Sequence, residues 1–199
     1  MLFRVVALIL LFIFDSFYIY KLVSLNKNAI KTNQMGIGNK APKVLIIERL
    51  TILATILVSL TELASIIFLK NLPCIQVQCI GLFFEILAVL FFAFATITMK
   101  KSWRVGIPEE KTKLITNGIY QWSRNPAFVG FDFLYLSICL MFFNIPLLIL
   151  SVWAIIMLHL QILQEEKHLE KMFGNEYMIY KTHTCRYLGI RKKLKYNLH

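Results

Sequence analysis

The chain has 199 residues, of which 58% are hydrophobic and 14% aromatic, and its mean hydropathy is +0.65. A soluble protein of this length cannot bury so much apolar surface, so the composition excludes a soluble globular domain and predicts an all-α, polytopic membrane protein. The net charge is +11, but the Lys and Arg residues lie in the gaps between apolar runs, where membrane lipids, and not nucleic acid, are the expected partners.

Five apolar runs along the chain predict about five transmembrane helices, because about 20 apolar residues cross the hydrocarbon core. The first run begins near the N-terminus and has no small-x-small cleavage site after it, so we expect an uncleaved span. The last two are joined only by residues 144–146, which predicts a tight helical hairpin with Pro146 at a helix start. The predicted spans are Leu2–Tyr20, Val44–Leu69, Leu72–Met99, Ala127–Phe143 and Ile145–Leu163.

The basic residues predict the orientation of the spans. Segments 21–43, 100–126 and 164–199 contain five, six and eight Lys and Arg residues, whereas the opposite ends contain only Arg4 and Lys70. By the positive-inside rule the three basic segments face the cytosol and the N-terminus lies outside, in a bacterial inner membrane or the endoplasmic reticulum. We therefore expect one membrane domain, 1–199, made of three spans (1–99), a cytosolic loop that would meet a cofactor (100–126), a helical hairpin (127–163) and a cytosolic C-terminal tail (164–199).

Polar residues cluster in the loop that precedes the fourth span. Gly118 permits a tight turn, and Pro126 restricts Asn125 to an extended conformation and can begin a helix. Arg124 would then lie beside a helix N-terminus, where a guanidinium and free backbone N–H groups can hold a carboxylate. The alternative is that Arg124 only reaches lipid phosphates.

A second polar cluster follows the fifth span. Glu165 and Glu166 point about 100° apart on a helix, so one can face inward while the other faces water. Gln161, Glu165 and His168 share one face by their spacing, and a carboxylate there could accept hydrogen bonds from a ribose or an ammonium group. The alternative is an ordinary solvated helix end.

The order of motifs L-I-T-x-G-I-Y, S-R-N-P-x-F-x-G, helical hairpin, E-E-x-x-L, F-G and Y-x-x-Y resembles the isoprenylcysteine carboxyl methyltransferase family, and in part the phospholipid methyltransferases, over residues 100–188. The resemblance implies an S-adenosylmethionine-dependent methyltransferase acting on a lipophilic small-molecule or lipidated acceptor by O-, S- or N-methylation. It also implies that Gly130 allows close helix approach. The cofactor contacts it implies are Thr112, Lys113, Leu114, Ile115, Tyr120, Asn125, Pro126, Glu165 and Glu166.

Two positions depart from the family pattern. Asn125 stands where the family usually has His, so it can form hydrogen bonds but cannot titrate near neutral pH. Gln161 stands where the prenylcysteine enzymes have an arginine suited to a substrate carboxylate, which argues against carboxyl methylation more than against the methyl donor. The candidate catalytic residues are Arg124, Asp132 and Gln161.

Acidic residues within the apolar runs are costly in lipid, which makes them functional candidates. Asp132 is the best placed, two residues after Gly130 and close to the expected methyl donor. Interhelical hydrogen bonds are the alternative explanation. These acids are Asp15, Glu48, Glu62, Glu85 and Asp132.

No cluster of His, Cys and acidic residues has the spacing of a metal site, so no metal is predicted. Two other classes of protein fit the sequence less well. A sterol-type membrane reductase that uses NADPH would be expected to have basic residues at positions 165 and 166, where this chain has Glu165 and Glu166. A small transporter or scaffold would not concentrate its polar motifs in two cytosolic segments.

Overall fold

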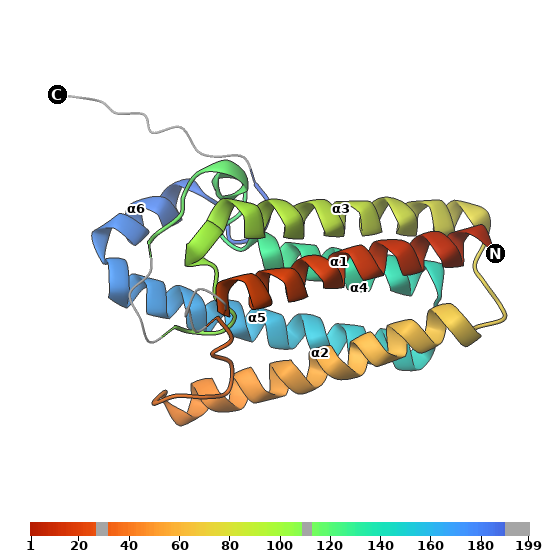
Figure 1. Cartoon of the computed structure of the whole chain (residues 1–199), viewed down its shortest axis with the longest axis horizontal. Coiled ribbons are helices and arrows are strands. Elements are labelled where there is room, and N and C mark those ends of the chain that lie inside the picture. Colours follow the sequence, from red (N-terminus) through yellow and green to blue (C-terminus); the bar gives the residue numbers. More distant parts are fainter. Residues whose placement is uncertain (27–31, 109–112, 190–199) are drawn as a thin grey trace.

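The structure is a computed structural model that describes residues 1–26, 32–108 and 113–189. Its helices form an elongated bundle (Figure 1) with a short additional helix at one end. In chain order the elements are α1 (Leu2–Asn26), α2 (Pro42–Phe68), α3 (Ile75–Met99), the 3₁₀ helices η1 (Lys100–Ser102) and η2 (Gly118–Gln121), α4 (Pro126–Met141), α5 (Ile145–Phe173) and α6 (Asn175–His183).

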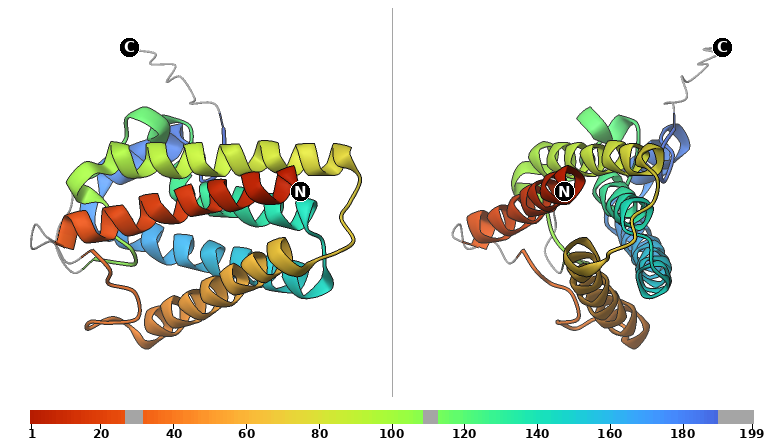
Figure 2. Two further views of the ribbon diagram at one scale, coloured as in Figure 1. Left: turned by 45° about the vertical axis from the view of Figure 1, so that its right-hand side comes forward. Right: turned by 90° about the vertical axis from the view of Figure 1, so that its right-hand side faces the viewer.

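The helices α1 to α5 run back and forth between two ends of the bundle (Figures 1 and 2). We call the end that carries η2, α6 and the α1–α2 connection the loop end, and the opposite end, with the α2–α3 and α4–α5 connections, the far end. The described parts of the three basic segments therefore meet at the loop end, as the distribution of Lys and Arg predicts. That the loop end faces the cytosol stays a prediction.

Within the described residues, four helices are long and apolar enough to cross a membrane, namely α1, α2, α3 and α5. The predicted fourth span is the 16-residue helix α4, which at 1.5 Å per residue is only about 24 Å long, shorter than a typical hydrocarbon core. Of the about five predicted transmembrane helices, four are therefore long enough to cross a membrane, and the fourth in chain order is a shorter apolar helix. The all-α, polytopic fold is confirmed, and α4 still returns the chain to the far end, where α5 begins (Figure 1).

Two glycines bring α3 and α4 into close contact. A Cβ atom on Gly130 would lie 3.1 Å from the Ala88 carbonyl oxygen, and one on Gly81 would lie 2.9 Å from the Ser137 carbonyl oxygen. Neither backbone oxygen can move without moving its helix, so only glycine fits at this spacing. The close helix approach implied for Gly130 is confirmed.

Arg4 joins the N-terminal part of α1 to the end of α2 at the far end. Its guanidinium donates to the carbonyl oxygens of Ile66 (3.2 Å) and Ile67 (2.8 Å), and also to that of Leu69. The last carbonyls of a helix lack intrahelical donors, so a cation there is favourable. This capping role explains a basic residue on the side of the bundle where few occur.

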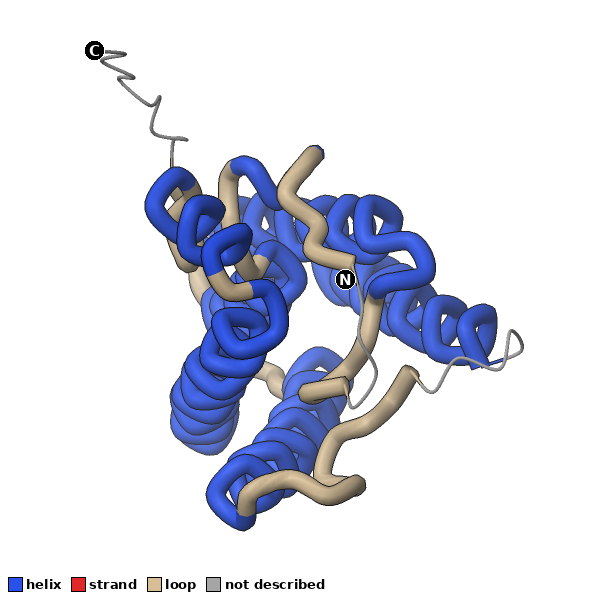
Figure 3. Tube along the Cα trace, turned by 90° about the vertical axis from the view of Figure 1, so that its left-hand side faces the viewer, coloured by secondary structure: helices blue, strands red, loops and turns tan. Residues whose placement is uncertain are grey.

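Glu48, at the loop end of α2, holds two connecting segments together. Its carboxylate accepts hydrogen bonds from the backbone N–H groups of Gly36 (2.7 Å) and Ile107 (3.1 Å) and from the Lys40 ammonium (2.8 Å). Val105 also forms backbone hydrogen bonds with the segment at 32–34. Figure 3, viewed from this end, shows the connecting segments lying over the ends of the helices. Glu48, a candidate for function from sequence, therefore fixes the connecting segments around Gly36 and Ile107. We call these segments the cover of the loop end.

Candidate functional site

The loop before α4 turns over the end of α3. Gly118 has φ +59°, a backbone conformation that favours glycine, and a Cβ atom there would lie 3.1 Å from the Thr98 side chain. The chain then forms η2, and Pro126 begins α4 after the extended residue Asn125. The predicted turn and helix start are thus both present, and they place residues 114–126 beside α5 and α6.

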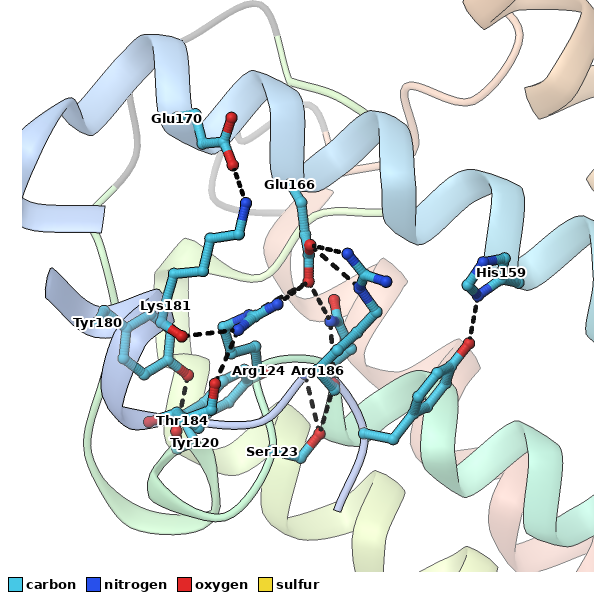
Figure 4. Close-up of polar contacts among 12 residues, drawn as sticks. Tyr120, Ser123, Arg124, His159, Glu166, Glu170, Tyr180, Lys181, Thr184 and Arg186 are labelled. Carbon is cyan, nitrogen blue, oxygen red and sulfur yellow. Dashed lines mark hydrogen bonds and ion pairs between the residues drawn. The ribbon is translucent and has the colours of Figure 1, made fainter. Parts of the chain in front are cut away.

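Glu166, on α5, is the centre of a buried polar cluster (Figure 4). Its Oε1 accepts hydrogen bonds from Arg124 Nη2 (2.9 Å) and Nε (3.2 Å) and from Asn125 Nδ2 (3.2 Å). Its Oε2 accepts from Arg186 Nη2 (2.9 Å) and Nε (3.1 Å). The hydrogen bonds that the Arg186 guanidinium donates to Glu166 raise the pKa of Arg186. One carboxylate thus connects the start of α4 to the segment after α6.

All three guanidinium nitrogens of Arg124 donate hydrogen bonds within the protein. Beyond the contacts to Glu166, its Nη1 donates to the carbonyl oxygens of Thr184 (2.7 Å) and Lys181 (3.1 Å) (Figure 4). The sequence predicted that an arginine beside a helix N-terminus would hold a carboxylate, and it does, but the carboxylate belongs to the protein. Glu166 accepts five hydrogen bonds, which exceeds the roughly four lone-pair positions of a carboxylate and leaves none for a ligand.

A cluster of aromatic and aliphatic side chains lies beside these polar contacts at the loop end, and we call it the aromatic wall. Tyr120, Tyr177 and Tyr180 are buried together, and Leu114 and Ile115 pack against them. The Tyr180 hydroxyl donates to the Tyr120 carbonyl oxygen at 2.6 Å. Burial raises the pKa of Tyr120 and Tyr180 above the ordinary value, so both phenols are neutral at physiological pH. Three of the predicted cofactor contacts thus lie in one cluster.

Gln161, Glu165 and His168 share one face of α5, as their spacing predicts. Gln161 is 1% exposed and donates to Glu165 Oε1 at 3.0 Å. Gln161 Oε1 and His168 Nε2 are buried and have no hydrogen-bond partner in the described part of the chain. Glu165 lies within electrostatic range of Tyr120, Glu48 and Lys40, so this face looks toward the aromatic wall and the cover.

The two adjacent glutamates therefore both point into the protein, on different sides of α5, and it is the next residue, Lys167, that is exposed. The expectation that one acid of the pair faces water does not hold. The reason is that the segment after α6 folds back over the start of α4 and covers Glu166 with Arg186.

The other predicted site residues are spread more widely. Lys113 is exposed, and Thr112 lies outside the described residues. Asp132 is half-buried on α4, further into the bundle, and its Oδ1 is buried without a hydrogen-bond partner among residues 1–26, 32–108 and 113–189. The structure brings Leu114, Ile115 and Tyr120 together with the Glu165 face, and places Asp132 apart from them.

Sequence reasoning did not single out Arg186 or Ser123. Arg186 belongs to the basic tail, which we assigned to lipid headgroups, and nothing in its local pattern distinguishes it. Ser123 Oγ accepts from the Asn125 N–H at 3.0 Å and donates to the Arg186 carbonyl oxygen at 3.2 Å. These contacts form because the segment after α6 folds back onto the start of α4, which the sequence alone does not indicate.

A face with unused hydrogen-bond acceptors beside an aromatic wall can bind a polar molecule that has both an ammonium or hydroxyl group and a flat ring. The model of one protein family, described as phospholipid methyltransferase, matches residues 77–176, which include Leu114, Ile115 and Tyr120 of the wall, Asn125, Pro126 and both glutamates. No curated protein matches the chain. The match covers half of the chain, including α4 and all of α5, and so this protein belongs to the phospholipid methyltransferase family, a family of membrane methyltransferases.

Proposed function

We propose that the protein transfers a methyl group from S-adenosylmethionine to a lipophilic acceptor at the loop end of the bundle. The observation that carries the proposal is the family match, which includes Leu114, Ile115 and Tyr120 of the aromatic wall and the Gln161–Glu165–His168 face. Membership in this family indicates a membrane methyltransferase. The chemistry of these residues supports S-adenosylmethionine as the methyl donor.

The residues present fit S-adenosylmethionine. Among residues 1–26, 32–108 and 113–189, Glu165 accepts one hydrogen bond, from Gln161, which leaves lone pairs for ribose hydroxyls or an ammonium group. Gln161 Oε1 is a further acceptor, buried and without a partner in the described chain. Leu114, Ile115 and Tyr120 offer the apolar and aromatic surface that a purine ring requires. We assign binding to these groups, and a supporting role to Glu166.

S-adenosylmethionine supplies a methyl group on a positively charged sulfur. The protein's part is to hold the acceptor in line with that group, and positioning of this kind can lower the barrier by roughly 7–11 kcal/mol in ideal cases. The charge on sulfur disappears in the transition state, so a site with little water favours transfer. The cover fixed by Glu48 and the buried wall around Tyr120 keep this region from water.

The acceptor reaches the site from the bilayer, because α3, α4 and α5 lead from the apolar part of the bundle to it. Arg124, the cation nearest the start of α4, has its guanidinium occupied by Glu166 and by two backbone carbonyls. No charge is therefore free at Arg124 to pair with a substrate carboxylate, whereas Gln161 Oε1 can accept a hydrogen bond. We infer an acceptor with an N–H or O–H group in preference to a carboxylate.

Labelled cofactors test the reaction class. Membranes containing the protein are incubated with methyl-labelled S-adenosylmethionine or with labelled NADPH, and lipid extracts are counted. The proposal predicts methyl label in the extract that depends on Glu165 and not on Glu176, an exposed acid of α6. Hydride transfer from NADPH with no methyl label would replace the proposal with a reductase.

A further inference from the structure

The segment after α6 lies against the loop that leads into α4. The Gly189 N–H donates to the Trp122 carbonyl oxygen at 3.1 Å, and the Arg124 N–H donates to the Cys185 carbonyl oxygen at 2.9 Å. These backbone hydrogen bonds hold residues 184–189, which we call the strap, alongside that loop. Because the strap is fixed on the bundle, its level relative to the apolar helices decides what its outer side contacts.

On α5 the strap reaches the level of the apolar run. The Tyr187 hydroxyl and His159 Nδ1 share a hydrogen bond of 2.6 Å, and the two rings stack with their centroids 6.1 Å apart (Figure 4). His159 lies four residues before Leu163, where the apolar run of α5 ends, which is about 6 Å along the helix. The strap therefore lies beside the last apolar turn of α5 and not in the polar region beyond it.

The loop that pairs with the strap lies at the corresponding level of α3. A Cβ atom on Gly118 would lie 3.1 Å from the side chain of Thr98, the second-last residue of α3. The chain then continues through Trp122 to Pro126, the first residue of α4. Figure 1 shows this loop beside the last turns of α3. Trp122 therefore lies at the edge of the apolar region, where α3 ends and α4 begins.

Trp122 and Leu188 present large apolar side chains at this edge. Trp122 is 67% exposed and Leu188 is 46% exposed. The other two tryptophans, Trp103 and Trp153, are buried and half-buried. An indole ring is favoured at a membrane interface, because its apolar body meets acyl chains while its N–H meets water or headgroups. Ile97 of α3, next to Thr98, is also exposed, so Trp122 and Leu188 extend the lipid-facing surface of the bundle.

We propose that Trp122 and Leu188 bind the boundary between the headgroups and the acyl chains of the bilayer, and that this contact holds the strap against α4 and α5. Part of the C-terminal tail is then a membrane-contacting segment. The lipid keeps Arg186, which belongs to the strap, in place on Glu166. The contact is separate from methyl transfer and does not depend on it.

Quenching of tryptophan fluorescence by brominated lipids tests the depth of Trp122. Trp103→Phe and Trp153→Phe together leave Trp122 as the only tryptophan. The protein is placed in phosphatidylcholine vesicles that carry bromine either near the headgroup or near the end of the acyl chains. We expect quenching at least about twofold stronger with the shallow bromine than with the deep one. Quenching by neither lipid, or quenching at least as strong with the deep bromine, would overturn the proposal.

The matched control is Met178→Trp in a protein whose native tryptophans are all replaced by Phe. Met178 is as exposed as Leu188, but it lies in α6, after α5 has ended at Phe173. The shallow bromine should quench this tryptophan at least about twofold less than it quenches Trp122. Equal quenching at the two positions would show that Trp122 has no particular contact with lipid.

A second measurement keeps the native tryptophans, so it does not depend on the folding of those variants. Leu188→Asp places a charge at the proposed lipid contact. In phosphatidylcholine nanodiscs, hydrogen exchange of the Gly189 and Arg124 N–H groups should then speed up by at least about tenfold. Met178→Asp, at a position of equal exposure, should leave both rates unchanged. Wild-type exchange rates in Leu188→Asp would contradict a strap held by lipid.

Discussion

Two adjacent glutamates of α5 have different roles because the helix turns them onto different faces. Glu166 accepts five hydrogen bonds, four of them from two guanidinium groups. Within the described part of the chain, Glu165 accepts one, from Gln161, and it faces the aromatic wall. Glu166 therefore holds the structure of the loop end, and Glu165 is the acid available to a ligand.

The substitution Glu166→Gln should lower stability by roughly 2–4 kcal/mol, because it leaves Arg124 and Arg186 without their carboxylate while Arg124 stays buried. The measurement is the free energy of unfolding in detergent, followed by circular dichroism. The matched control is Glu170→Gln, whose ion pair with Lys181 has both side chains 34% exposed and so should contribute at most about 1 kcal/mol. Equal losses in the two variants would contradict the anchoring role.

For individual residues, the sequence predicts contacts within a helix but not contacts between distant segments. The spacing of Gln161, Glu165 and His168 predicts their common face because helix geometry is regular. The pairing of Arg186 with Glu166 depends on how the chain folds back after α6, and no local pattern encodes it. The same return of the chain makes Arg124 an internal partner and not a group free for a substrate.

Among the helices, the contact between α3 and α4 depends on the absence of side chains at Gly81 and Gly130. Gly130→Leu should destabilise the protein by about 1–3 kcal/mol or more, since its side chain would collide with the Ala88 carbonyl and with Phe92. The thermal unfolding midpoint of Ala64→Leu, an exposed position on α2, provides the comparison and should not fall. A Gly130→Leu protein as stable as the wild type would show that the two helices can separate freely.

The connecting segments at the loop end depend on Glu48. Glu48→Ala removes the acceptor for the Gly36 and Ile107 N–H groups, so their hydrogen exchange should speed up by at least about tenfold. The amide of Arg124, which donates to the Cys185 carbonyl oxygen, belongs to a different contact and should exchange at its wild-type rate. Unchanged exchange at Gly36 and Ile107 would contradict the role of Glu48 in the cover.

The sequence predicts the helices better than their ends. Apolar runs identify all five main helices, and Pro126 and Pro146 mark helix starts correctly. The predicted end of the fifth span, Leu163, falls short of the helix end at Phe173, because hydropathy follows the lipid boundary while the helix continues beyond it as a polar segment. That extension carries Glu165 and Glu166, so the site lies on helix that a hydropathy reading alone omits.

For the whole molecule, the accumulation of Lys and Arg at the loop end predicts that this end faces the cytosol. Two exposed cysteines report on the two ends, Cys74 in the α2–α3 connection and Cys185 after α6. With the other cysteines replaced, an impermeant maleimide should label Cys74 in intact cells and Cys185 only after permeabilisation. The reverse pattern would invert the orientation and place the site outside.

Calorimetry in detergent measures whether the Gln161–Glu165–His168 face and the aromatic wall bind S-adenosylmethionine. We predict that the wild type and Glu176→Gln bind S-adenosylmethionine with equal affinity, and that Glu165→Gln binds it at least about tenfold more weakly while keeping its unfolding midpoint. No binding to folded wild type at millimolar S-adenosylmethionine, or equal binding by Glu165→Gln, would contradict a cofactor site at Glu165.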